Sequence, residues 1–366
     1  MPERSQERLA ALDAFRGLTV AAMILVNNPG EWDAVYRPLQ HAAWNGWTPT
    51  DLIFPFFLFI TGVTTYISLK SPSDERRWPR VLKRTALIFA LGLFLNGFPL
   101  FDLSTLRIPG VLQRIALCYA GAAALTLVAR TRTRVIVFGL IGVGYAMAMQ
   151  SIPMPGSPAG IVGPGQNLAA WIDERLLPGH LLHDGWDPEG ILTTLPALAT
   201  ALCGVFAGEW LCSLRSRQQQ AVGLAAAGLV GLALGLALNP VCPINKTIWS
   251  SSFVLFSGGA ALAGLALCLW LIDVHGWRRW STPFVAYGRN PIVAYVLSTL
   301  VAKQLLLWSI TQADGTSTNA ANYIFQTIYL PLASPVAASL LYAATYTLLW
   351  LAVAAALYRQ GVLIKI

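Results

Sequence analysis

The stretch HAAWNGWTPTD at residues 41–51 runs directly into LIFPFFLFITG at residues 52–62. The second part is apolar enough to begin a membrane-spanning helix. The first part brings a histidine, an asparagine and an aspartate to the mouth of that helix. Ionisable groups at such a boundary are costly, so they mark a functional site by default. Because histidine suits proton or acyl transfer near neutral pH, the stretch predicts a reactive site at one membrane face.

The composition of the whole chain agrees with a membrane protein. Of its 366 residues, 55% are hydrophobic and 11% are charged, whereas a soluble domain carries about 25% charged residues. The apolar runs are about 20 residues long, which fits helices and not the strands of about 10 residues in a membrane barrel. We therefore predict an all-α, polytopic integral membrane helix bundle of about ten transmembrane helices. The expected helices are 12–30, 50–70, 79–98, 110–129, 134–151, 190–213, 219–238, 248–272, 286–309 and 334–358.

The distribution of basic residues indicates the orientation of this bundle. With the N-terminus in the cytoplasm, seventeen lysines and arginines fall in cytoplasmic segments and four in outer loops. The positive-inside rule therefore places both termini in the cytoplasm. The net charge of +8 then reflects topology, and nucleic acid is not an expected partner. The cytoplasmic residues are Arg4, Arg8, Lys70, Arg76, Arg77, Arg80, Lys83, Arg84, Arg130, Arg132, Arg134, Arg215, Arg217, Arg278, Arg279, Arg359 and Lys365, and the outer ones are Arg37, Arg107, Arg175 and Lys246.

The chain is expected to form a single transmembrane domain over residues 1–366, with a long outer loop at residues 152–189. This loop is rich in proline and glycine, so we predict turns and a short helix around Leu168–Leu176. Such a long loop is typical of a lid over a binding site. His180, His183 and Asp184 lie in it, but no second ligand pair is evident, so we expect no metal site.

Five polar residues are predicted to meet at the outer face. Asn27 and Asn28 end the first apolar segment, and His41, Asn45 and Asp51 precede the second. Asp51 is a candidate to orient the imidazole of His41, as a carboxylate does in other histidine catalysts.

Two arginines are expected at the cytoplasmic face. Arg16 lies three residues after Asp13 on one helix face, so it either forms an ion pair there or meets an anionic ligand. Arg289 and Asn290 precede Pro291, which fits the first turn of a helix. The N–H groups of that turn, with Arg289 beside them, form either a phosphate site or a simple helix start.

Arg114 begins the fourth expected helix, at its outer end. The positive-inside rule does not favour an arginine there. It either pairs with Asp51 or Asp102, or it holds the acceptor or the acyl donor.

Several motifs together resemble the heparan-α-glucosaminide N-acetyltransferase family. They are LDAFRG at 12–17, Asn27, HAAWNG at 41–46, the segment 48–51 with FPFFLF at 54–59, GVLQRI at 110–115 and GRNPI at 288–292. The resemblance covers most of the chain, and the histidine block is its specific part. It implies a multi-helix transferase that takes acetyl-CoA from the cytosolic side and acetylates the amine of a glucosamine on the far side.

The resemblance also implies roles for individual residues. The active-site histidine of the family falls on His41 and its catalytic asparagine on Asn27, although the spacing between the two is a few residues longer here. From the residue arguments above, and not from the resemblance, Arg16, Arg114, Arg289 and Asn290 are the expected binding residues for acetyl-CoA. The chain is similar to a compact bacterial member without the lumenal N-terminal domain of the lysosomal enzyme. We therefore expect a multi-pass protein of the bacterial inner membrane.

Two mechanisms and three functions stay open from the sequence. His41 either acts as general base while Asn27 stabilises the oxyanion, or it carries the acetyl group itself. The alternatives to an amino-sugar N-acetyltransferase are an amino-sugar or oligosaccharide transporter and a glycan O-acyltransferase. The expected partners are acetyl-CoA, an amino sugar or glycan acceptor, and the lipid bilayer, and assembly as a homodimer is left open.

Overall fold

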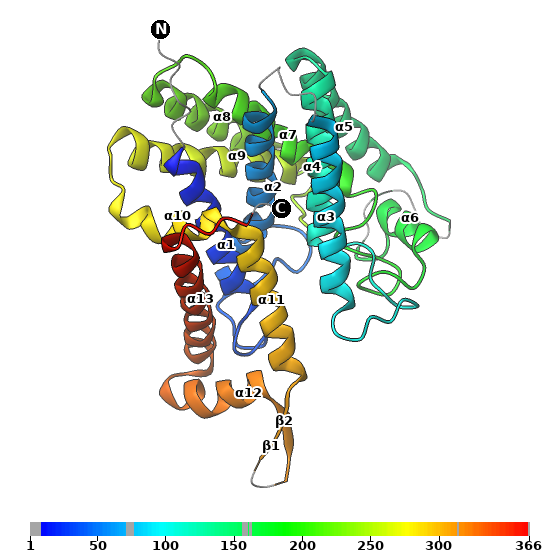
Figure 1. The fold of residues 1–366 in the computed structure, drawn as a ribbon. Helices are drawn as coiled ribbons and strands as arrows, with labels where there is room; N and C mark the ends of the chain where they lie inside the picture. Colours follow the sequence, from blue (N-terminus) through cyan, green and yellow to red (C-terminus); the bar gives the residue numbers. More distant parts are fainter. Residues whose placement is uncertain (1–8, 71–76, 156–159, 161–162, 313–314, 365–366) are drawn as a thin grey trace. The chain divides into compact units, whose positions relative to one another are not determined.

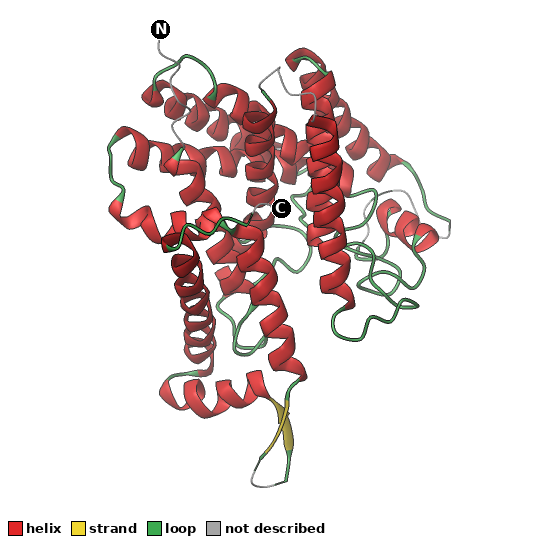
Figure 2. Cartoon of the chain, viewed as in Figure 1, coloured by secondary structure: helices red, strands yellow, loops and turns green. Residues whose placement is uncertain are grey.

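In the computed structural model of the protein, the regular secondary structure is almost all helix (Figures 1 and 2). It describes residues 9–70, 77–155, 160, 163–312 and 315–364. Arg4, Arg8, Arg76 and Lys365, which entered the orientation argument, lie outside the described residues. The prediction of an all-α polytopic bundle is confirmed. The helices are α1 Ala10–Asn27, α2 Ile53–Leu69, α3 Arg77–Gly97, α4 Val111–Val128, α5 Thr131–Ser151, α6 Leu168–Leu176, α7 Thr194–Leu211, α8 Arg217–Leu238, α9 Ser251–Cys268, α10 Thr282–Arg289, α11 Pro291–Leu307, α12 Ala320–Ile324 and α13 Pro335–Arg359.

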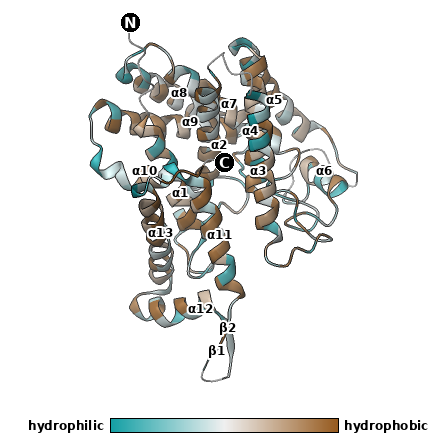
Figure 3. Ribbon diagram, viewed as in Figure 1, coloured by the Kyte–Doolittle hydropathy of each residue, from teal (hydrophilic) through white to brown (hydrophobic). Residues whose placement is uncertain are grey.

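Each of the ten helices expected from the sequence is present as a helix, but not all ten have the composition of a membrane span. Among the described residues, eight helices are long and apolar enough to cross a membrane, and the bent pair α10 and α11 makes up to nine. Hydrophobic residues dominate these helices in Figure 3. The remaining helix is α3, whose first two turns carry Arg77, Arg80, Lys83 and Arg84.

The helix expected at residues 286–309 is broken near its start. Helix α10 ends at Arg289, α11 begins at Pro291, and the two segments meet at an angle of 74°. Pro291 occupies the first turn of α11, as predicted. Its ring disfavours a helical conformation at Asn290, which adopts φ −128° and ψ 53°.

The described chain divides into two compact units. Among the described residues, unit one comprises residues 9–41, 48–53 and 264–364, and unit two comprises residues 42–47 and those between 54 and 263. In unit one, α1 and α10 pack backbone against backbone. A Cβ on Gly17 would lie 1.7 Å from the carbonyl oxygen of Phe284, and one on Gly288 would lie 1.9 Å from that of Asp13. Only glycine allows this approach, so the motifs at 12–17 and 288–292 are held together.

Unit two has an equally close crossing between α2 and α7. A Cβ on Gly62 would lie 1.9 Å from the carbonyl oxygen of Ala201, and one on Gly204 would lie 1.9 Å from that of Phe59. Helix α4 also packs on α3 and α7. These contacts set the frame on which the loop after α5 is held.

The two long connections have local structure of their own. Helix α6 at Leu168–Leu176 confirms the short helix predicted in the outer loop. Its first turn is capped by Asn167, whose side chain accepts the N–H of Ala170. The connection after α11 forms a small antiparallel hairpin of β1 Ser309–Thr311 and β2 Ser317–Asn319, followed by α12.

Candidate functional site

The polar stretch before α2 brings His41 and Asp51 into direct contact in unit one. Nδ1 of His41 lies 2.7 Å from Oδ1 of Asp51. The histidine side chain is 51% exposed, whereas the aspartate side chain is 2% exposed. The pair therefore places an accessible imidazole on a buried carboxylate. This is the contact expected from the sequence.

The Asp51 carboxylate is itself held in place by Thr48. Oδ2 of Asp51 accepts the backbone N–H of Thr48 at 3.0 Å, and the hydroxyl oxygen of Thr48 lies 3.1 Å from the same atom. Thr48 and Asp51 form a capping box on the short 3₁₀ turn Pro49–Leu52 that leads into α2. When Nδ1 donates to a fixed carboxylate, Nε2 carries the lone pair of the imidazole. The arrangement therefore selects the tautomer that can act as a base through Nε2.

The two asparagines at the end of α1 differ in what their side chains do. The Asn28 amide donates to the carbonyl oxygen of Ile24 at 2.7 Å and so caps its own helix. Asn27 is the last residue of α1 and is exposed, and within the described residues its side chain makes no hydrogen bond. Of the two, Asn27 is the one whose amide is available to a ligand.

Arg16 lies at the crossing of α1 and α10. Its Nη1 is 3.2 Å from Oδ1 of Asp13 and donates to the carbonyl oxygen of Gly288 at 2.9 Å. The ion pair expected at spacing three is therefore present. The second contact ties Arg16 to the backbone next to Arg289, so two predicted binding residues come from one packed junction.

Arg289 and Asn290 have different surroundings. The Arg289 guanidinium stacks over the ring of Tyr358 at 4.5 Å, and its buried Nε makes no hydrogen bond within the described chain. Asn290 is buried, and its amide donates to the carbonyl oxygen of Val362 and accepts the N–H of Ile364, both at 2.9 Å. The Asn290 side chain thus holds the C-terminal segment.

Arg114 is in unit two and is 1% exposed. Its Nη2 donates to the hydroxyl of Thr193 and, at 3.4 Å, to the carbonyl oxygen of Gly190. Its guanidinium lies 5.1 Å from the ring centre of Trp249. The pairing with Asp102 considered from the sequence is not formed.

The other hydrogen bonds of Asp102 account for the absence of that pairing. Asp102 is taken up by Ser104 and Thr105, whose hydrogen bonds lower the pKa of its carboxyl. Arg114 instead keeps buried Nε and Nη1 atoms that have no hydrogen-bond partner in the described part of the chain. A buried guanidinium in that state fits an oxygen-rich ligand or bound water.

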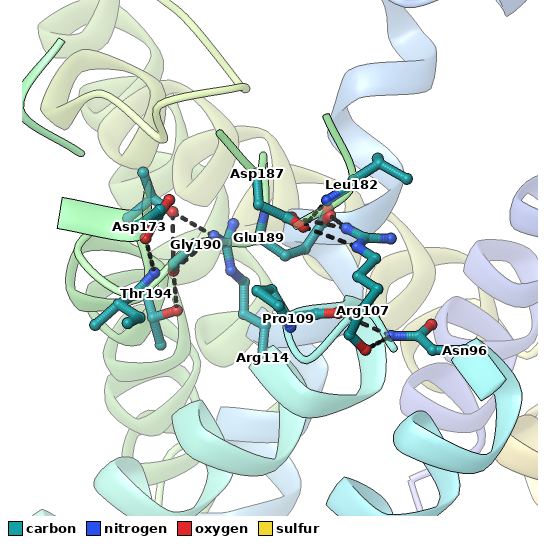
Figure 4. Close-up of polar contacts among 12 residues, drawn as sticks. Asn96, Arg107, Pro109, Arg114, Asp173, Leu182, Asp187, Glu189, Gly190 and Thr194 are labelled. Atoms are coloured by element: carbon teal, nitrogen blue, oxygen red, sulfur yellow. Dashed lines mark hydrogen bonds and ion pairs between the residues drawn. The ribbon is translucent and has the colours of Figure 1, made fainter. Parts of the chain in front are cut away.

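A second arginine, which the sequence did not single out, anchors the outer loop (Figure 4). Arg107 forms a bidentate pair with Asp187 at 2.8 and 2.7 Å, and its Nη2 lies 2.6 Å from Oε2 of Glu189. Burial opposes the charge of Arg107, but its bonds to the two carboxylates raise the pKa of its guanidinium overall. The partners are 80 and 82 residues apart, so no local pattern could have revealed them.

The same loop carries a buried acid on α6. Oδ1 of Asp173 accepts the N–H of Ile191 at 2.8 Å, and the residue is 1% exposed. The pKa of the Asp173 carboxyl is raised to about 6: burial raises it most, the hydrogen bond from Ile191 lowers it, the nearby Asp187 raises it and the charge of Arg114 lowers it. The outer loop is thus held in place by ion pairs and hydrogen bonds, and it contains the Asp173 carboxyl, whose pKa is raised to about 6.

The histidines of the outer loop serve its packing. Nδ1 of His180 lies 2.8 Å from the carbonyl oxygen of Leu106, and the ring of His183 stacks on Trp186 at 4.2 Å. Across the described residues, no group of three or more histidine, cysteine or acidic side chains is arranged to hold a metal ion.

Comparison with known proteins places these motifs in one family. A family model described as heparan-alpha-glucosaminide N-acetyltransferase, catalytic, matches residues 8–236. The chain belongs to this family. The matched residues include Arg16, Asn27, His41, Asp51 and Arg114, whereas Arg289 and Asn290 lie beyond them.

Individual relatives agree with the family assignment. The chain is 30% identical over 353 residues to the heparan-alpha-glucosaminide N-acetyltransferase of Homo sapiens, covering 79% of this chain and 52% of that protein. It is 29% identical over 356 residues to the protein of the same name from Mus musculus, covering 80% and 53%. The chain thus spans about half the length of the curated relatives it matches.

Proposed function

We propose that this protein is a transmembrane acetyltransferase that moves an acetyl group from acetyl-CoA to the amine of a glucosamine-type sugar. Membership of the N-acetyltransferase family supports the reaction class. The observation that carries the proposal is the pair formed by an accessible His41 and a buried Asp51 within the matched segment. No other described histidine has a carboxylate on its ring: His180 and His183 are occupied by loop contacts.

In the proposed reaction His41 acts as general base. Its Nε2 takes the proton that the sugar amine loses as the nitrogen bonds to the acetyl carbonyl carbon. It returns that proton to the sulfur of CoA as the thioester C–S bond breaks. Asp51 holds the tautomer and stabilises the imidazolium that forms between the two transfers.

Asn27 is the proposed donor to the oxyanion. Its exposed amide can donate to the carbonyl oxygen on which negative charge develops. The amide of Asn28 instead donates to the carbonyl oxygen of Ile24. Removing one such donor typically costs about 10²- to 10³-fold in kcat.

The donor is proposed to bind from the cytoplasmic side. The basic residues of the inner segments set that orientation, and Arg16 and Arg289 lie together at the α1–α10 junction. Arginine forks suit the phosphates of CoA. Arg114, with its unpartnered nitrogens, is the proposed contact for an oxygen of the donor or acceptor on the outer side. The cell compartment that fits this scheme is a bacterial inner membrane, with the acceptor in the periplasm.

The test is acetyl transfer by the purified protein in detergent. Labelled acetyl-CoA and glucosamine should yield an N-acetyl product that resists hydroxylamine, because an amide survives where an ester is cleaved. His41→Ala should abolish transfer while acetyl-CoA binding persists, and His180→Ala should retain transfer. A hydroxylamine-sensitive product would make the protein an O-acyltransferase. Absence of acetyl-CoA binding to the wild type would instead favour a transporter.

A further inference from the structure

Residues 41–51 form a loop whose two ends are tied together. The Thr48 hydroxyl donates to the carbonyl oxygen of Gln40 at 2.6 Å, and the bond between His41 and Asp51 closes the same base. These base residues belong to unit one, and the intervening residues 42–47 belong to unit two. His41 is therefore joined through residues 42–44 to the tip of this loop at residues 45 and 46.

The tip is held by the connection between α8 and α9. The N–H of Gly46 donates to the carbonyl oxygen of Ile244 at 2.7 Å. Nδ2 of Asn245 donates to Oδ1 of Asn45 at 3.1 Å. All four residues of these two bonds lie in unit two. On the α8–α9 connection the bonds are made by two consecutive residues, Ile244 and Asn245.

Asn245 is the fixed member of this pair. It is 0% exposed, and its Oδ1 accepts the N–H of Ile248 at 3.1 Å. Its own N–H donates to the hydroxyl of Ser250, and its carbonyl oxygen accepts the N–H of Ser250, both at 3.0 Å. Nδ2 is thus aimed at Asn45 by a side chain with no freedom to rotate, whereas Asn45 is exposed.

We propose that Asn245 is a positioning residue for His41. Only residues 42–44 separate His41 from Asn45, so a shift of the tip is transmitted along the chain to the imidazole. A misplacement of about 1 Å at a reacting group can cost about 10²-fold in rate. The inference rests on the proposed function, because it concerns the rate of the transfer in which His41 takes part.

The test exchanges the two amides for carboxylates. In Asn45→Asp the Nδ2 of Asn245 still finds an acceptor. In Asn245→Asp the exposed Asn45 amide can turn and donate instead. Each single variant should keep kcat within about 3-fold of the wild type, since one hydrogen bond is retained. The double variant places two carboxylates against each other, with no N–H to donate between them. Its kcat should fall by about 10- to 100-fold, and its KM for acetyl-CoA should be unchanged.

A matched pair separates positioning from a loss of stability. Asn167 is also a buried asparagine of unit two, with side-chain bonds to Gly163 and Ala170. Asn167→Asp should lower the melting temperature without changing kcat per folded molecule, alone or combined with Asn45→Asp. Two results would overturn the inference. One is a wild-type kcat in the double variant Asn45→Asp/Asn245→Asp. The other is a fold-change in its kcat equal to the product of the fold-changes of its two single variants, as is expected for the control pair.

Two further outcomes keep this test separate from that of the proposed function. If the double variant does not fold, Asn45→Ala replaces it, because it removes the acceptor at an exposed position. An about 10-fold lower kcat then supports the inference, and unchanged kcat overturns it. If the wild type transfers no acetyl group at all, the proposed function fails first, and Asn245 has no reaction to serve.

Discussion

The Asp51 carboxylate decides which nitrogen of His41 is basic. In Asp51→Asn the amide can present its N–H to Nδ1 and leave the proton on Nε2, which is the wrong tautomer for a base. We expect kcat to fall by about 10²- to 10⁴-fold, the upper end being the loss seen in serine protease triads, while acetyl-CoA affinity is kept. Asp102→Asn is the control, because that carboxylate is exposed and, among the described residues, bonds to Ser104 and Thr105 alone. Wild-type kcat in Asp51→Asn would remove the carboxylate from the mechanism.

Asp173 gives the stability of the outer loop a pH dependence. Its pKa is raised to about 6 in the folded protein, from an ordinary value of 3.8. The folded state therefore binds this proton more tightly than the unfolded state does. The stabilisation is fully present below pH 3.8 and is lost as pH rises through about 6.

The corresponding variant is Asp173→Asn, which keeps the acceptor for Ile191 and removes the charge. Its melting temperature at pH 8 should exceed that of the wild type by a few degrees, and the difference should vanish near pH 4. Thermal unfolding across this range checks both statements. An equal difference at both ends would mean that the carboxyl does not titrate in this window.

Helix packing at α1 and α10 sets the geometry of the proposed donor site. In Gly288→Ala the added carbon would lie 1.9 Å from the carbonyl oxygen of Asp13, so the helices must separate. We expect a loss of about 1–3 kcal/mol in stability, as for other overpacked sites, together with weaker acetyl-CoA binding through Arg16. Gly139→Ala on α5 is the control, since nothing lies within 4 Å of its added carbon. If Gly288→Ala and Gly139→Ala changed acetyl-CoA binding equally, the packing of α1 on α10 would not determine the geometry of the donor site.

The sequence predicts best those features that depend on neighbours along the chain. Helix α6 follows from a local apolar pattern, and the His41–Asp51 contact spans a single short loop. The break at Asn290 was missed because hydropathy continues through it, although Pro291 carries the signal. The partners of Arg107 were missed because folding, and no local pattern, brings residues 80 apart together.

Across the whole molecule, the proposal requires that donor and acceptor enter from opposite sides. The phosphates of CoA cannot cross about 30 Å of hydrocarbon, so the acetyl group must move through the helix bundle. In sealed proteoliposomes, transfer should occur when acetyl-CoA and glucosamine are on opposite sides of the membrane. It should be absent when both are on the same side, whichever side that is.

Both opposite-side arrangements are tested, because only molecules whose cytoplasmic end faces acetyl-CoA should transfer, and a population of mixed orientation contains such molecules in either arrangement. Detergent, which gives both substrates access to both ends, should restore the full rate and serves as the control. Transfer with both substrates on one side would mean that the two sites open to the same face. The charge-based orientation would then still hold for the helices, but the acetyl group would not need to cross the membrane at all.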